Sequence, residues 1–344
     1  MGVKGKKYLK IMLIVITMLL LVIAIGAVVI VSQIGASFYD NQIEIVDTSA
    51  KKDFSDKELS EEDIEQIGSA NDSIYKEQQK DNDIINIVLA GVDARKYEEN
   101  SRSDTIILLS YNKTEHTVKL ISFLRDSWVY LPERGWGKIN SATAYGGVGL
   151  LVNTLNENFD LDVQHYAQIK FSDFTKVIDI LGGIDIELTK SEIDYINMKL
   201  HTEDRDYSND LKASPGMVHL NGVQTLWHCR NRSIGNGDFK RTERQRDVLE
   251  ILINKALSMR LANMTQLVYE LKDYVDMNIP ITAILSLGKD ALITGDLTIE
   301  AHQIPFENAF QFATKQGQSV IELNMDKTVD ELHKIVGFES EEDD

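Results

Sequence analysis

Two aspartates and a group of arginines lie where the sequence predicts loops at the ends of buried strands. Asp93 follows one run of aliphatic residues, and Asp104 begins the next run along the chain. Arginines lie near these carboxylates and in a later glycine-containing loop, and a glutamine follows that loop. These residues are Arg95, Arg102, Arg125, Arg230, Arg232, Arg241 and Gln245. Guanidinium groups stay charged and bind phosphate through paired hydrogen bonds, so several of them at one crevice suit a pyrophosphate.

The two aspartates also suit a metal ion. Carboxylates at adjacent strand ends are expected at one sheet edge, where they repel each other unless a proton or a cation lies between them. Because no His or Cys accompanies them, Asp93 and Asp104 favour Mg²⁺, with Mn²⁺ as the second choice. The alternative is that each aspartate only caps a turn, which is a common role for Asp at strand ends.

Other catalytic signatures are missing from the sequence. The chain contains no Gly-x-x-x-x-Gly-Lys-Ser/Thr loop and no Gly-x-Ser-x-Gly motif, and its seven histidines are scattered. A nucleotide kinase and a serine hydrolase therefore have no support. The single cysteine, Cys229, excludes a disulfide framework and a cysteine-cluster metal site. Three aromatic residues (Trp128, Tyr130 and Trp136) flank Arg125, and they belong either to the core or to a pocket for an apolar chain.

The hydrophobic pattern predicts the elements that must position these residues. Residues 84–90, 105–110 and 118–123 are short, nearly continuous aliphatic runs, which are typical of strands buried on both faces. Strands that alternate with helices predict an α/β domain over residues 84–338, with a central, mostly buried β-sheet between helices. Further strands are expected at residues 184–188 and 297–304, and helices at 140–159, 172–182, 220–230, 242–261, 324–336 and, in two pieces, within 265–292.

The N-terminal segment predicts a membrane anchor. Residues 1–10 form a basic tip, and residues 11–31 are 21 uncharged residues. As a helix they would span about 31 Å, enough for a hydrocarbon core of about 30 Å. Lysines before this span predict a single-pass protein of the cell membrane, with a cytoplasmic N-terminus and an extracytoplasmic body. A signal peptide cleaved near Ser37 is the alternative, because residues 35–37 are small.

The formal net charge of −18 is unevenly distributed along the chain. Residues 32–83 contain 14 acidic residues and five lysines, which predict an acidic stalk between membrane and body. Residues 339–344 form a second acidic segment, a short tail. Because nucleic-acid binding requires a surplus of Lys and Arg, the overall charge excludes nucleic acid as a partner.

Six motifs in order give the chain a specific resemblance to a known family. They cover about residues 84–261 and read NIVLAGVDAR, SRSDTIILLSYN, ISFLRDSWVYLP, KINSATAYGG, FSDFTKVIDILGGIDIEL and LNGVQTLWHCRNRSIGNGDFKRTERQRDVL. Together with the apolar segment before them, they resemble the LytR-CpsA-Psr family of extracytoplasmic phosphotransferases, found chiefly in Gram-positive bacteria. Nothing after about residue 262 contributes to the resemblance.

The resemblance implies a function and a set of site residues. The family transfers glycopolymers, such as wall teichoic acid or capsular polysaccharide, from a polyprenyl-pyrophosphate carrier to peptidoglycan, and a hydrophobic pocket holds the polyprenyl tail. It implies that Asp93 and Asp104 hold Mg²⁺ against the pyrophosphate. It assigns the pyrophosphate oxygens to Arg102, Arg125, Arg230, Arg232, Arg241 and Gln245. The catalytic residues expected on this basis are Asp93, Arg95 and Arg125.

Two other functions are compatible with the same residues. One is a binding or regulatory protein that holds polyprenyl-linked precursors without turning them over, which would fit the family's historical label of transcriptional attenuators. The other is a pyrophosphatase, in which water replaces the sugar hydroxyl. The sequence does not identify the transferred polymer, because charged loops recognise a pyrophosphate that all such carriers share.

Overall fold

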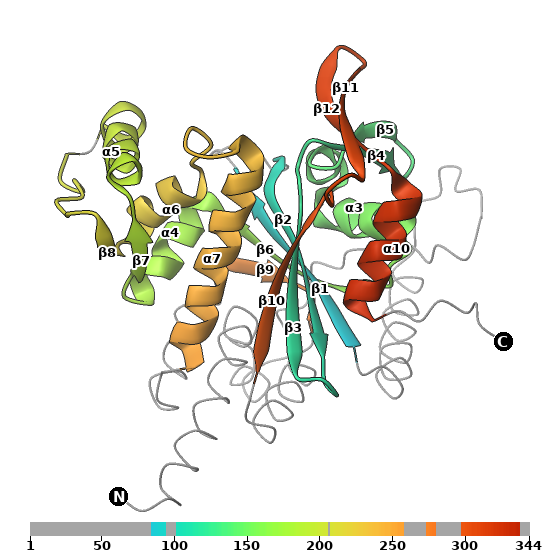
Figure 1. Cartoon of the computed structure of the whole chain (residues 1–344), viewed down its shortest axis with the longest axis horizontal. Helices are drawn as coiled ribbons and strands as arrows, with labels where there is room; N and C mark the ends of the chain where they lie inside the picture. The colour runs from blue at the N-terminus through green and yellow to red at the C-terminus, as the bar shows by residue number, and fades with distance from the viewer. Residues whose placement is uncertain (1–83, 94–100, 206, 258–272, 280–296, 338–344) are drawn as a thin grey trace, which may run out of the picture.

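A six-stranded sheet, called the main sheet below, lies at the centre of the computed structural model, which describes residues 84–93, 101–205, 207–257, 273–279 and 297–337 (Figure 1). Its strand order is β10-β3-β2-β1-β6-β9. β1 is antiparallel to β2 and parallel to β6, whereas β3 is antiparallel to β2 and parallel to β10. The six strands are β1 (Ile84–Val92), β2 (Ser103–Asn112), β3 (Thr117–Phe123), β6 (His165–Lys170), β9 (Val275–Met277) and β10 (Thr298–Ile304).

The main sheet is apolar on both faces, as its continuous aliphatic runs predict. Successive side chains of a strand point to opposite faces. Val88 and Leu108 therefore belong to one hydrophobic cluster. Their neighbours Ile87 and Leu109 belong to another. The expected central, buried sheet of an α/β domain is confirmed.

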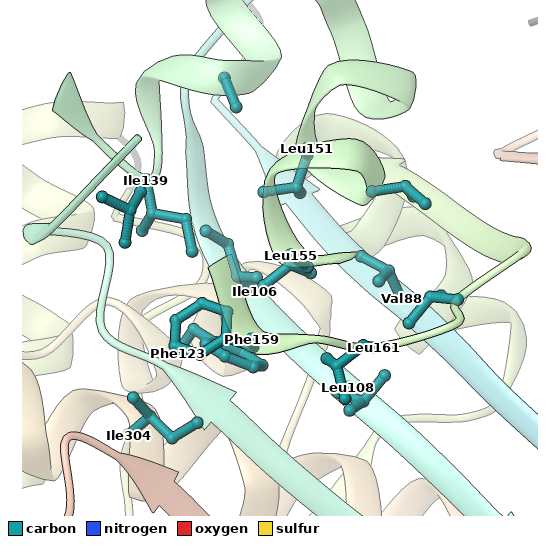
Figure 2. Packing of buried hydrophobic residues seen from close by; sticks show 14 of the residues in the cluster. Val88, Ile106, Leu108, Phe123, Ile139, Leu151, Leu155, Phe159, Leu161 and Ile304 are labelled. Carbon is teal, nitrogen blue, oxygen red and sulfur yellow. The ribbon is translucent and has the colours of Figure 1, made fainter. Parts of the chain in front are cut away.

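Helices cover both faces of the main sheet. On one face lie α3 (Ser141–Phe159) and α10 (Met325–Val336), and Figure 2 shows Leu155 and Phe159 of α3 beside Phe123. On the other face, α7 (Gly237–Leu257) contributes Ile253 to the second cluster. Each fully buried side chain of this kind stabilises the fold by about 1.5–3 kcal/mol relative to an exposed one.

Two smaller sheets extend this arrangement. A four-stranded sheet, in the order β11-β12-β4-β5, adds Val129 and Ile321 to the first cluster. Its strands are β4 (Ser127–Leu131), β5 (Gly135–Lys138), β11 (Phe310–Lys315) and β12 (Gln318–Leu323). A third cluster joins the two-stranded sheet of β7 (Ile184–Leu188) and β8 (Gly216–Leu220) to α4 (Phe171–Ile180), α5 (Lys190–Lys199) and α6 (Gly222–Cys229).

The structure corrects several expectations. The helix expected at 242–261 begins at Gly237, so α7 includes residues that the sequence assigns to a loop. Residues 275–277, inside a segment expected to be helical, form β9 and pair with β6. The strands β4, β5, β6, β8, β11 and β12 have no counterpart among the predicted elements, because such short strands contain too few alternations to give a clear period.

The predicted basic tip, membrane span, stalk and acidic tail (residues 1–10, 11–31, 32–83 and 339–344) lie outside the described residues. Within the part of the chain that the structure describes, no helix has both the length and the apolar character required to cross a membrane. The membrane anchor therefore stays a prediction from the sequence.

Candidate functional site

The ends of β1 and β2 bring the two predicted carboxylates to one end of the main sheet. These antiparallel neighbours place Val92 opposite Ser103, with a register irregularity between Gly91 and Val92. Asp93 directly follows β1, and Asp104 is the second residue of β2. The expected placement of both aspartates at one sheet edge is confirmed.

Asp104 is bound by arginines from distant parts of the chain. Arg125, which follows β3, donates from Nη1 to Oδ1 of Asp104 at 2.5 Å, and Nη2 of Arg232 lies 3.7 Å from Oδ2. Burial by itself would raise the pKa of Asp104. The nearby guanidinium groups of Arg125, Arg241 and Arg232 outweigh burial and lower the pKa below its usual value. Asp104 is therefore a fixed anion around which the arginines gather.

The site contains a third carboxylate, Asp238, that sequence reasoning alone misses. Asp238 lies in the first turn of α7. Its oxygens lie 3.3 Å from Nε of Arg125, 3.1 Å from Nε of Arg232 and 3.3 Å from Nη1 of Arg241. The sequence places Asp238 in a loop before the helix expected at 242–261, where nothing marks it as a partner of the arginines. Once the helix is known to begin at Gly237, the available signal is Arg241 at position i+3, which places both side chains on one helix face.

Arg241 is a buried guanidinium whose hydrogen-bonding capacity is unused. The residue lies in α7 instead of the predicted loop, and it is only 1% exposed. Among the described residues, Nε, Nη1 and Nη2 have no hydrogen-bond partner, although Asp238 lies within ion-pair distance. Burial lowers the pKa of Arg241 to about 10, with Arg232 and Arg125 adding to the effect, so the side chain remains cationic at neutral pH. Buried donors of this kind normally have partners, which indicates an anionic ligand.

Gln245 lies one turn after Arg241 and is also buried. Its Nε2 approaches the Cys229 carbonyl oxygen at 3.5 Å, and its Oε1 has no hydrogen-bond partner in the described part of the chain. The structure thus keeps Gln245 beside the cluster on the same helix as Arg241, and its amide has capacity left for a ligand.

Arg230 pairs with Asp93. Its Nη2 donates to Oδ2 of Asp93 at 3.0 Å. The guanidinium also stacks over two rings, 5.0 Å from the centroid of Phe171 and 5.1 Å from that of Trp227. The ion pair and the two cation–π contacts hold this side chain in one orientation.

Of the two remaining predicted arginines, the structure describes only Arg102. Arg102 directly precedes β2 and is exposed, and within the described ranges it forms no ion pair. Arg95 lies outside the described residues. Three arginines (Arg125, Arg232 and Arg241) therefore meet two aspartates (Asp104 and Asp238) in one network, and Arg230 forms a separate ion pair with Asp93. The surplus of positive charge suits an anion with several oxygens.

The carboxylates of this network are compatible with Mg²⁺. Within the described ranges, no three His, Cys, Asp or Glu side chains group as a metal cage. Mg²⁺ does not need one, because one or two carboxylates together with waters and substrate phosphates commonly hold it. Asp93 and Asp104 provide such a pair at one end of the main sheet.

Comparisons with known proteins connect this site to a family. The sequence model of the LytR_cpsA_psr family matches residues 45–334. The regulatory protein MsrR of Staphylococcus aureus is 30% identical over 244 residues, which cover 70% of this chain and 70% of MsrR. The polyisoprenyl-teichoic acid--peptidoglycan teichoic acid transferase TagT of Bacillus subtilis is 30% identical over 181 residues, which cover 52% of this chain and 54% of TagT.

The same relationship holds in three dimensions. The solved structure of TagT bound to LI-WTA has a TM-score of 0.59 and 25% sequence identity, and the match covers 74% of this chain and 92% of that one. The family match also extends beyond the six motifs on both sides, so that β10, β11, β12 and most of α10 belong to the shared fold. This chain therefore belongs to the LytR_cpsA_psr family.

Proposed function

We propose that this protein transfers a phosphate-linked glycopolymer from a polyprenyl-pyrophosphate carrier to peptidoglycan at the outer face of the cell membrane. The buried guanidinium of Arg241, which has no hydrogen-bond partner among the described residues and lies inside a network of arginines and aspartates, carries this proposal. A pyrophosphate supplies the several anionic oxygens that such a network can bind. The name of the relative TagT, a transferase of teichoic acid to peptidoglycan, supports the same class of reaction.

The reaction is a displacement at phosphorus. A sugar hydroxyl of peptidoglycan attacks the phosphorus on the glycan side, a new P–O bond forms, and the bond to the bridging oxygen breaks. Polyprenyl phosphate leaves with the electron pair of that bond. Negative charge grows on the bridging and equatorial oxygens, where preorganised cations lower the barrier. Arg125, Arg232 and Arg241 are the cations that the structure collects.

The aspartates hold these cations before substrate arrives. Asp238 touches three of the arginines and Asp104 touches two, so the guanidinium planes have fixed positions in the free protein. Fixed dipoles and charges cost little reorganisation during the reaction, which is the main advantage of such a site. Loss of one donor of this kind is expected to cost about 3 kcal/mol in the barrier.

In this proposal the carboxylates at the end of the main sheet accept the hydroxyl proton and hold the metal ion. Asp93 is more exposed than Asp104 and is our candidate for the group that accepts the proton, on condition that the metal ion leaves one of its oxygens free. Asp93 and Asp104 would also hold Mg²⁺, with Mn²⁺ as the second choice. When bound, the ion would neutralise charge on the phosphate oxygens. In this proposal residues 11–31 anchor the protein in the membrane.

A labelled-glycan assay tests the proposal. The full chain, purified in detergent, is incubated with a polyprenyl-pyrophosphate glycan, peptidoglycan and Mg²⁺, and the label is followed with wild type, Asp104→Ala and Asp330→Ala. Asp330 is the control, because it is exposed on α10 and belongs to none of the ion pairs of the site. We expect label on peptidoglycan with wild type and Asp330→Ala, and little with Asp104→Ala.

The same assay separates the alternatives. Free glycan phosphate without attachment to peptidoglycan indicates a pyrophosphatase. Label that stays on the lipid with every protein, together with tight lipid binding, indicates a regulatory binding protein. The name of the relative MsrR, a regulatory protein, is the observation that favours this second candidate.

A further inference from the structure

Two aromatic side chains stand exposed on one face of the β4–β5 hairpin. The hairpin places Tyr130 directly opposite Trp136, and these side chains are 36% and 56% exposed. Their ring centroids lie 6.1 Å apart with an interplanar angle of 74°. Trp128, on the same face, is buried. Of the three aromatic residues that flank Arg125 in sequence, one is therefore packed and two form a surface platform.

The platform has a rigid support. Val129 and Leu131 point to the other face of the hairpin and belong to the first hydrophobic cluster. Asn158 of α3 accepts a hydrogen bond from the Tyr130 N–H at 2.9 Å and donates one to the Tyr130 carbonyl oxygen at 2.6 Å. Because the backbone is fixed, a ligand that packs on these rings has little ordering entropy to overcome.

The platform is continuous with the arginine network. Lys138 follows Trp136 by two residues on the same strand and therefore shares its face. Two residues of strand correspond to about 7 Å. Lys138 donates to Oδ1 of Asp126 at 2.8 Å, and the other oxygen of Asp126 lies 3.8 Å from Nε of Arg125. Figure 1 shows β4, β5 and the beginning of α7 at the same end of the main sheet.

We infer that the Tyr130–Trp136 platform binds the sugar rings of the peptidoglycan strand that accepts the transferred polymer. This inference rests on the proposed function. A pyranose ring has an apolar C–H face whose hydrogens carry partial positive charge, and the face of an aromatic ring carries the complementary negative charge. An exposed aromatic pair that is partly hydrated in the free protein gains by packing against such a ligand.

The local charge favours the acceptor over an anionic donor polymer. The turn between β4 and β5 contains one acid and one base, Glu133 and Arg134, so it adds no net charge beside the rings. A polyanionic glycopolymer would need cations along its path. The uncharged faces of amino-sugar rings need only the aromatic surface. Lys138, which shares the face of the platform, is paired with Asp126, and the arginines lie in the network on the other side of Asp126.

Direct binding of peptidoglycan strands tests the platform. The full chain in detergent is titrated with soluble peptidoglycan glycan strands free of lipid, and binding is followed by calorimetry for wild type, Trp136→Ala and Trp136→Phe. We expect Trp136→Ala to weaken binding at least about tenfold, which corresponds to about 1.4 kcal/mol of lost ring contact, and Trp136→Phe to retain most of it. Phe312→Ala is the matched control, because Phe312 is 71% exposed on the opposite face of the same sheet.

Three outcomes overturn the platform. Equal affinity of wild type and Trp136→Ala is one, and absence of binding by wild type is another. The third is loss of affinity for the soluble anionic donor polymer instead of the peptidoglycan strands. Binding of the polyprenyl-pyrophosphate carrier in the absence of acceptor should be unchanged by Trp136→Ala. Glycan binding that depends on Trp136, in a protein that moves no labelled polymer, would retain the platform and refute the proposed transfer.

Discussion

One buried ion pair holds the loop that carries two arginines of the site. The Arg244 side chain is 2% exposed, and its Nη2 lies 3.0 Å from Oε1 of Glu192 on α5. The same guanidinium donates to the carbonyl oxygens of Asn231 at 3.1 Å and Ile234 at 3.0 Å. Arg230 and Arg232 lie in this loop. We therefore expect Arg244 to act as a positioning residue.

The magnitude follows from the burial of the pair. Glu192→Leu would leave the Arg244 guanidinium buried without a counter-charge, which costs about 3–5 kcal/mol of folding stability. Replacing both partners by apolar side chains (Glu192→Leu with Arg244→Met) removes both charges, so part of the lost stability should return, although the capping contacts of Glu192 with the Thr189 N–H and hydroxyl stay lost. The carbonyl oxygens of Asn231 and Ile234 still lose their donors in the double variant, and the loop is released.

The assay measures stability and transfer on the same proteins. Urea midpoints give the unfolding free energies of wild type, both single variants and the double variant. The labelled-glycan assay gives kcat/KM for each. We expect the double variant to regain part of the lost stability yet lose about 100-fold in kcat/KM, because a misplacement of about 1 Å at a catalytic group has this effect. Recovery of stability and transfer together would refute the reasoning, since Arg244 would then be purely structural.

Four further predictions follow from the site and the sequence. Arg241→Lys should reduce kcat/KM about 100-fold, by loss of a guanidinium donor, whereas Arg134→Lys should leave kcat/KM unchanged. Equal kcat/KM values for Arg241→Lys and wild type would contradict the anion site. Chelation of divalent ions should stop transfer by wild type, and added Mg²⁺ should restore it; activity unchanged by chelation would remove the metal from the proposal. Burial lowers the pKa of His228 from 6.5 to about 4, so between these values the unfolded chain binds a proton that the native chain does not. Stability should therefore fall by about 3 kcal/mol as the pH falls through this window, and His228→Gln should show a smaller fall between urea midpoints at pH 7 and pH 4.5. N-terminal sequencing of the protein from membranes should find residues before Ser37; a mature chain that begins near Ser37 would replace the anchor by a cleaved signal peptide.

Local pattern was sufficient for the framework of the site. Continuous aliphatic runs predicted the central strands, because a strand buried on both faces needs apolar side chains at every position. The ends of those strands then placed Asp93 and Asp104 at one sheet edge, which the antiparallel register of β1 and β2 confirms. The order of the motifs was also sufficient for the family.

Only the tertiary structure decided which charges meet. Arg230 and Asp93 are 137 residues apart in sequence, and Arg125 and Asp238 are 113 apart, so no periodicity links them. Asp238 fell in a predicted loop, and only the packing of α7 beside the ends of the main sheet brings it to Arg125. The burial of Arg241 and the exposure of Trp136 could not be predicted from the sequence either, because the exposure of a side chain depends on neighbours from distant segments. Sequence determines which side chains can carry charge, and packing determines which of them lose water and must find a partner or a ligand.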